Sequence, residues 1–236
     1  MTKNNNPEKE SLAEIAVDPD VLAKELALEV ENDPLEQLDN YSFSNDLNIT
    51  QECNEALKML NGNREERIQG LRIFCEYRDQ RAFPFLLPLL DQPCPVERMS
   101  AVYALGRNPC PSAVQKLVSL LETDDNAYVR RATAWSLANY DNQIVLKPLI
   151  NALKNDVAAV RLWSSSSLAE IGNVSMENAK LAAEQLLISL KIDNESGVRS
   201  NCIWSLSRLY EKLNISFQES FIDECTKIAL FDKEPS

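Results

Sequence analysis

The chain of 236 residues contains no histidine. Without an imidazole, four kinds of site are excluded: a Ser-His-Asp triad, a Cys-His dyad, a histidine-ligated zinc site and a two-His-one-carboxylate iron site. We therefore expect no catalytic residues that act without a partner, and no metal site within the chain. What remains is a protein that binds, or one that completes its chemistry with groups on another molecule.

Long apolar runs are also absent. The most apolar stretch, residues 83–90, is far shorter than the about 20 apolar residues of a membrane-spanning helix. The first eight residues carry no apolar stretch, so we expect no secretory signal. None of the six cysteines forms a Cys-x-x-Cys pair. Reduced thiols and a cytoplasmic protein are the expectation.

Basic residues are scarce in one segment only. The net charge of the chain is −12, and residues 1–50 hold three lysines against twelve acidic residues, a net charge of −9. The acidic balance argues against a nucleic-acid partner. We expect residues 1–49 to be an acidic, largely disordered, mobile extension with a short amphipathic helix at 20–31, and residues 50–232 to form the folded domain. The short helix serves either solubility or docking.

Glycine is rare as well, with five in the chain, and strand-like alternation of β-branched residues is missing. What is present is a repeated nine-residue segment with an arginine at its second position and an apolar residue at its ninth. The arginines are 31, 32, 31 and 38 residues apart. They are Arg67, Arg98, Arg130, Arg161 and Arg199.

Second amphipathic stretches separate these segments, at residues 84–90, 116–121, 148–153 and 184–190. Their apolar residues follow helical spacing, so each repeat is predicted to be a helical hairpin. One hairpin cannot bury its apolar face alone, and stacked hairpins share a core. The predicted fold is an all-α solenoid of about five hairpins. We place an insertion near 173–177, an entering helix at 50–61 and a closing helix at 217–230.

The phrase Val-Arg-x-x-Ala-x-x-x-Leu, carried by residues 128–137 and 159–163 among others, resembles the short HEAT-like repeat of the phycobilisome-lyase family. The resemblance covers about residues 60–215 and is greatest to cyanobacterial E/F-type lyase subunits. It implies a HEAT-type superhelix, often part of a two-subunit assembly. It also implies a phycobilin, an open-chain tetrapyrrole, as ligand and a phycobiliprotein as partner. The nucleophilic thiol would then belong to that partner.

The five arginines, which we call the arginine ladder, lie just after turns that carry Asp91, Asp124, Asp125, Asp156 or Asp193. A guanidinium that bonds its own turn or a neighbouring one would fix how the repeats stack. A structural role is therefore the first hypothesis for this motif.

A second set of side chains shares one face of the arginine segments, at spacings of three, four and seven residues. We expect it on the concave side of the solenoid, where a partner binds. Three interpretations stay open: packing between repeats, a protein-binding groove, and a pigment groove. The candidate residues, which we call the aromatic–arginine stripe, are Tyr103, Arg107, Trp135, Asn139, Trp163, Glu170, Trp204 and Arg208.

Three functions are consistent with these patterns. The chain is a scaffold that holds another protein in its concave groove, a bilin lyase subunit as the resemblance implies, or a non-catalytic adaptor in cofactor assembly such as iron–sulfur cluster biogenesis. The expected partner is accordingly a phycobiliprotein or a cofactor-assembly protein.

Overall fold

The computed structural model describes residues 47–140 and 143–231. The expected extension therefore lies outside the described residues, except for residues 47–49, and so does the helix expected at 20–31. The described part is helical and contains no strand. Its α-helices are α3 (Leu47–Met59), α4 (Arg64–Glu76), α5 (Phe83–Leu89), α6 (Pro95–Arg107), α7 (Val114–Thr123), α8 (Ala127–Leu137), α9 (Leu146–Asn155), α10 (Ala158–Gly172), α11 (Met176–Ile192), α12 (Ser196–Leu209) and α13 (Ile215–Phe231).

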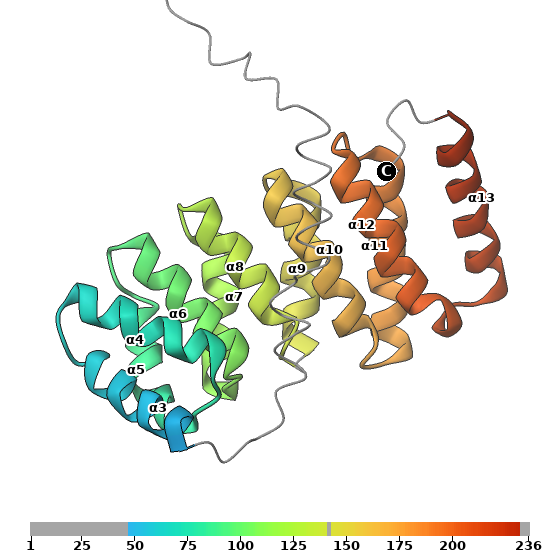
Figure 1. Ribbon diagram of the computed structural model, residues 1–236. Helices are drawn as coiled ribbons and strands as arrows, with labels where there is room; N and C mark the ends of the chain where they lie inside the picture. The colour runs from blue at the N-terminus through green and yellow to red at the C-terminus, as the bar shows by residue number, and fades with distance from the viewer. Residues whose placement is uncertain (1–46, 141–142, 232–236) are drawn as a thin grey trace, which may run out of the picture. The chain divides into compact units, whose positions relative to one another are not determined.

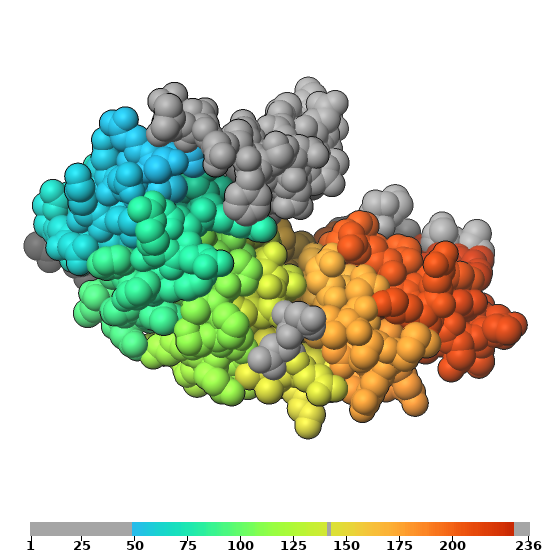
Figure 2. All heavy atoms as spheres, turned by 90° about the horizontal axis from the view of Figure 1, so that it is seen from below, coloured from blue at the N-terminus to red at the C-terminus, as the bar shows by residue number. Residues whose placement is uncertain are grey.

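Two layers of helices make up the fold, which is the all-α solenoid that the repeat predicts (Figure 1). The arginine segments form α4, α6, α8, α10 and α12, and each of these packs directly on the next. The second amphipathic stretches form α5, α7, α9 and α11, which contact one another less. In the space-filling view, successive repeats touch along the described length (Figure 2). We call the arginine layer the inner layer, and its surface opposite the other layer the inner face.

Side chains at the helix starts explain why the hairpins turn where they do. Asn63 accepts a hydrogen bond from the backbone of Glu66, whose carboxylate accepts one from the backbone of Asn63 in return. Asn126 caps α8 and Ser175 caps α11. Asn214 accepts from the backbone N–H of Phe217, so that α13 begins two residues before the predicted start.

The core is built from equivalent positions of the repeat. The apolar residue at the ninth position of each segment is fully buried: Phe74, Leu105, Leu137, Leu168 and Leu206. Each such side chain contributes ~1.5–3 kcal/mol by leaving water. The fifth position is buried and always small, which lets the two helices of a hairpin approach. At Gly70, a Cβ atom would lie 2.9 Å from the carbonyl oxygen of Ala56 in α3.

The 38-residue step lengthens two helices, α10 and α11. The turn between α10 and α11 is short, but α11 has 17 residues where α7 and α9 have 10 each. Among the described residues, no helix is long and apolar enough to cross a membrane.

Candidate functional site

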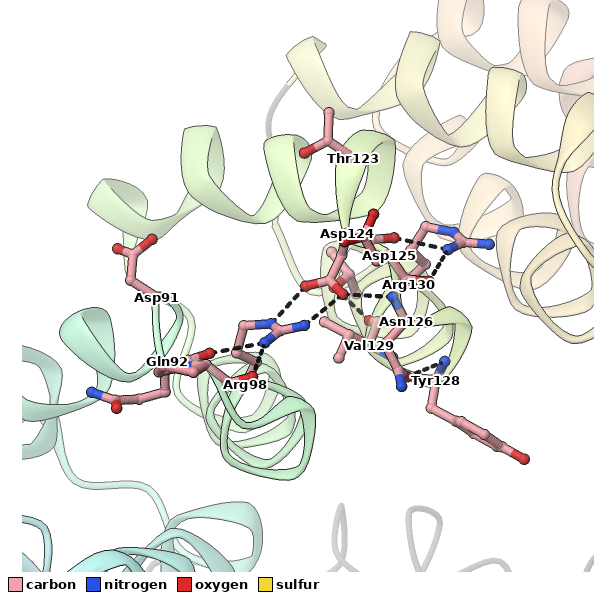
Figure 3. Close-up of polar contacts among 12 residues, drawn as sticks. Asp91, Gln92, Arg98, Thr123, Asp124, Asp125, Asn126, Tyr128, Val129 and Arg130 are labelled. Carbon is pink, nitrogen blue, oxygen red and sulfur yellow. Dashed lines mark hydrogen bonds and ion pairs between the residues drawn. The ribbon is translucent and has the colours of Figure 1, made fainter.

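The arginine ladder runs along the turns at one edge of the inner layer. In three successive repeats, the guanidinium donates two hydrogen bonds of 2.7–2.8 Å to one aspartate in the turn after the next helix: Arg98 to Asp124, Arg130 to Asp156 and Arg161 to Asp193. The same guanidinium also donates to backbone carbonyls of the turn before its own helix, as Arg98 does to Gln92 and Pro93 (Figure 3). Each arginine thus ties two consecutive turns together.

Asp124 shows how the turn holds its carboxylate. Its side chain is 3% exposed. Burial alone would raise the pKa of Asp124, but hydrogen bonds from Arg98 and from the backbone N–H of Asn126 outweigh burial and lower it. Arg98 is held correspondingly in its charged form, because the hydrogen bond to Asp124 raises its pKa. The pair is therefore a fixed, charged unit of the fold.

The two ends of the ladder differ from its middle. Arg67 bonds the carboxylate of Glu97 in the first turn of α6, at 2.7–2.8 Å, and no turn aspartate. Asp91 is not part of the ladder, since its exposed carboxylate instead accepts from Lys116. Arg199 donates to the carbonyls of Asp193 and Asn194, at 3.1 and 3.2 Å. That the ladder fixes the stacking of repeats stays a prediction.

Hydroxyl and amide groups add a second set of bonds between neighbouring inner helices. Ser167 of α10 donates to the carbonyl of Ala134 in α8, and Ser205 of α12 donates to the carbonyl of Ser165. Asn201 donates to the carbonyl of Leu162 at 2.9 Å. The serine run of α10 is thus a contact surface between helices.

The aromatic–arginine stripe falls into separate groups. In the first, the ring centroids of Tyr103 and Trp135 are 5.3 Å apart with an interplanar angle of 56°. Trp135 also covers Gly106, where a Cβ atom would lie 2.4 Å from the indole ring. Arg107 donates to the carbonyl of Glu76 at 3.3 Å. These side chains are half-buried, so part of each ring faces solvent.

The second group links α10 and α12. Glu170 and Arg208 form an ion pair of 2.8 Å, and the guanidinium carbon of Arg208 lies 4.9 Å from the ring centroid of Trp204. Trp204 is 44% exposed. Trp163 stands apart from this group and packs half-buried against the core.

Asn139 does not join the stripe. It lies beyond the end of α8 and donates a long 3.5 Å bond to the carbonyl of Ser136. Just beyond it, the Tyr140 hydroxyl donates to the carbonyl of Leu105 at 2.9 Å. In the preceding repeat, Asn108 makes the equivalent contact with the carbonyl of Phe74.

Comparison with known proteins agrees with this geometry. Residues 54–138 and 114–207 match the family model of HEAT repeats, and together they cover more than half of the chain. The chain belongs to the HEAT repeat family. No curated protein matches it.

Two solved structures share the fold of this HEAT repeat protein. A designed armadillo repeat protein superimposes with a TM-score of 0.54 and 19% identity, over 77% of this chain and 92% of its own. An engineered protein superimposes with a TM-score of 0.50 and 23% identity, over 86% of this chain and 92% of its own. Identities this low establish the architecture alone.

Two inner-face residues of the HEAT array are missing from the sequence-based set. Tyr128 is 65% exposed and precedes Trp135 by seven residues. Arg131 donates to the hydroxyl of Tyr103 at 3.3 Å, and its guanidinium carbon lies 5.8 Å from the ring centroid of Tyr128. Helical spacing alone would have found both, had the stripe been extended towards the start of α8.

Among the described residues, no group of three or more cysteines, aspartates or glutamates could hold a metal ion. All six cysteines are free. A hollow of about 520 Å³ lies beside the second group of the stripe, lined by residues that include Arg208, Tyr210 and Ile222.

Proposed function

We propose that this HEAT repeat protein is a scaffold that binds another protein on its inner face. The observation that carries the proposal is the second group of the stripe. Trp204 is 44% exposed, whereas Cys202 and Leu206 of the same helix are buried, and Arg208 lies over the Trp204 ring. Exposed tryptophan and arginine are the side chains that dominate binding energy at protein interfaces. Repeat arrays bind their partners on extended inner surfaces of this kind.

Site-specific photocrosslinking tests the proposal. The chain offers a matched pair of positions, because Trp204 on the inner layer and Ile188 on α11 of the other layer are 44% and 47% exposed. Benzoylphenylalanine is introduced at each position in the full chain and irradiated in lysate of the source cell. We expect a discrete adduct from position 204 and none from position 188. Equal adducts from both positions, or none from 204, would refute a dedicated inner binding face.

A stability measurement accompanies the crosslinking. Because Trp204 is half in solvent, Trp204→Ala should lower the free energy of unfolding by no more than ~1 kcal/mol while the adduct partner is lost from pull-down. A loss of several kcal/mol would assign Trp204 to packing between repeats.

The lyase hypothesis is a second candidate, supported by the resemblance of the repeat and by one local observation. The hollow of about 520 Å³ has the size of a ligand site, and Arg208 at its edge lies over the Trp204 ring. An aromatic face and a guanidinium are what the rings and propionates of a linear tetrapyrrole would contact. Glu170 is already paired with Arg208, which leaves it less available to pyrrole nitrogens.

Incubation of the purified chain with an open-chain bilin tests the second candidate. Induced visible absorbance together with tryptophan quenching that disappears in Trp204→Ala would support it. An unchanged spectrum would reject it and leave the scaffold proposal intact. An adaptor in iron–sulfur cluster assembly would have to rely on cluster ligands of its partner, because the described residues offer no such group.

A further inference from the structure

We propose that the inner face of α4, α6 and α8 binds an extended acidic peptide segment of the partner protein, through Arg72, Arg131 and the aromatic side chains around them. The proposal rests on the scaffold function and specifies the chemistry of the partner. It concerns a different part of the stripe from the Trp204 group.

Arg131 is the centre of this surface. It follows the ladder arginine Arg130 directly in sequence, yet no carboxylate among the described residues pairs with it. Its contacts are the Tyr103 hydroxyl at 3.3 Å and the Tyr128 ring at 5.8 Å. Its Nε is buried and has no hydrogen-bond partner. A half-buried guanidinium without an anion is a costly arrangement that an incoming carboxylate would relieve.

Arg72 occupies the position in its repeat that Tyr103 occupies in the next repeat and Trp135 in the one after. It therefore lies on the same face. It is exposed, and its guanidinium makes no hydrogen bond or ion pair with another described residue. By helical position the same face also carries Glu65 and Glu76 of α4, whereas α8 contains no acidic residue beside Arg131.

Aromatic surface lies between the charges. Tyr128 is 65% exposed, and the Tyr103–Trp135 ring pair is half-buried beside Arg131. A guanidinium pairs with a carboxylate through two parallel hydrogen bonds, and the adjoining rings take up apolar or aromatic side chains. The surface is thus suited to a chain in which acidic and apolar residues alternate.

A nucleic acid fits this surface less well. The positive charge is confined to a few arginines, and residues 51–236 as a whole have a net charge of −3. A polyanion that follows the surface beyond these arginines would meet net repulsion, and a peptide segment with a few carboxylates would not.

The test uses the full chain and a fluorescein-labelled 16-residue peptide in which glutamate alternates with leucine and tyrosine. Its counterpart carries lysine in place of glutamate, and a polythymidylate serves as the second anionic probe. Fluorescence anisotropy gives the Kd. We expect the acidic peptide to bind, the lysine peptide and the polythymidylate to bind at least tenfold more weakly, and added salt to weaken binding.

Two charge reversals locate the site. Arg72→Glu should weaken acidic-peptide binding about tenfold or more. Lys180→Glu, on α11 with the Lys180 side chain 71% exposed, changes the net charge equally and should leave the Kd unchanged. Arg131→Gln gives a second probe of the site, and the exposed Arg72 keeps the test decisive if Arg131→Gln folds poorly.

Equal weakening by Arg72→Glu and Lys180→Glu would overturn the inference, and so would equal binding of the lysine peptide or the polythymidylate. A different result would reject the scaffold proposal. An adduct at position 204 without acidic-peptide binding leaves the scaffold and rejects this site, whereas absence of the adduct rejects the scaffold itself.

Discussion

Arg130 and Arg131 are neighbours in α8, and they show two different uses of the same side chain. Arg130 donates to both carboxylate oxygens of Asp156 and to the carbonyl of Asp124. Arg131 meets a tyrosine hydroxyl and a tyrosine ring on the inner face. At the turn edge the ladder guanidiniums pair with carboxylates and carbonyls of the chain, whereas Arg131 on the inner face has no carboxylate partner among the described residues. We therefore expect the turn edge to stabilise the fold and the inner face to bind a partner.

The largest expected effect comes from opening the turn edge. Asp124→Ala leaves the partly buried Arg98 without its carboxylate and should lower the free energy of unfolding by ~3 kcal/mol. Asp91→Ala is the control, because Asp91 is 67% exposed in its pair with Lys116 and should cost less than ~1 kcal/mol. Urea unfolding followed by circular dichroism measures both, and equal losses would contradict a structural ladder.

A smaller effect should follow from crowding the ring pair of the inner face. In Gly106→Ala the new Cβ would lie 2.4 Å from the Trp135 ring, which has to move, at a cost of ~1–3 kcal/mol. Gly197→Ala in α12 meets nothing closer than 3.7 Å and should be neutral or stabilising by ~0.5–1 kcal/mol. Urea midpoints and Trp135 fluorescence follow the change. A neutral Gly106→Ala would contradict a rigid packing of the Trp135 ring on α6.

Low pH should remove the stability that the aspartates of the turn edge contribute. The folded pKa values of Asp124, Asp156 and Asp193 lie below the ordinary 3.8. A lowered carboxyl pKa contributes stability that is complete above the unfolded value and is lost as the pH falls through the folded value. The difference in unfolding free energy between wild type and Asp124→Ala should therefore be constant from pH 7 to about 5 and shrink below about 3.8. A difference that already shrinks near neutral pH would contradict a lowered pKa of Asp124.

The smallest expected effect concerns the reactivity of the thiols and does not involve the stability of the fold. Cys94 caps α6 at the turn edge, where the backbone N–H of Glu97 and the guanidinium of Arg64, 3.0 Å away, lower its pKa. Burial raises the pKa of Cys75 and Cys202 to about 12. Iodoacetamide at neutral pH should alkylate Cys94 well before these two, as mass spectrometry would show. Faster alkylation of Cys202 would indicate that the inner helices open.

The repeat in the sequence was sufficient to predict the solenoid, because every arginine helix repeats the same buried positions at nearly constant spacing. It also predicted Asp124, Asp156 and Asp193 as carboxylates beside the ladder. It could not predict the partner of Arg67, since Glu97 lies within a helix and its inward direction depends on packing. Nor could spacing show that Asp91 faces Lys116.

The inner face was predicted less completely. Helical spacing placed Tyr103 and Trp135 on the same face of neighbouring helices, and their ring centroids are 5.3 Å apart. The pairing of Glu170 with Arg208 depends on how closely α10 and α12 pack, which no local pattern encodes. Asn139 was placed on the same helical face, but α8 ends at Leu137, before Asn139. Tyr128 and Arg131 were missed, although the helical spacing would have identified both.

The central claim is that the turn edge is structural and the inner face binds. Urea unfolding of Arg130→Gln and Arg131→Gln, measured side by side, tests it most directly because the two residues are adjacent and the change is identical. The account predicts a loss of ~3 kcal/mol for Arg130→Gln, which leaves Asp156 without its guanidinium, and less than ~1 kcal/mol for Arg131→Gln. Equal losses for the two variants, or a greater loss for Arg131→Gln, would contradict it.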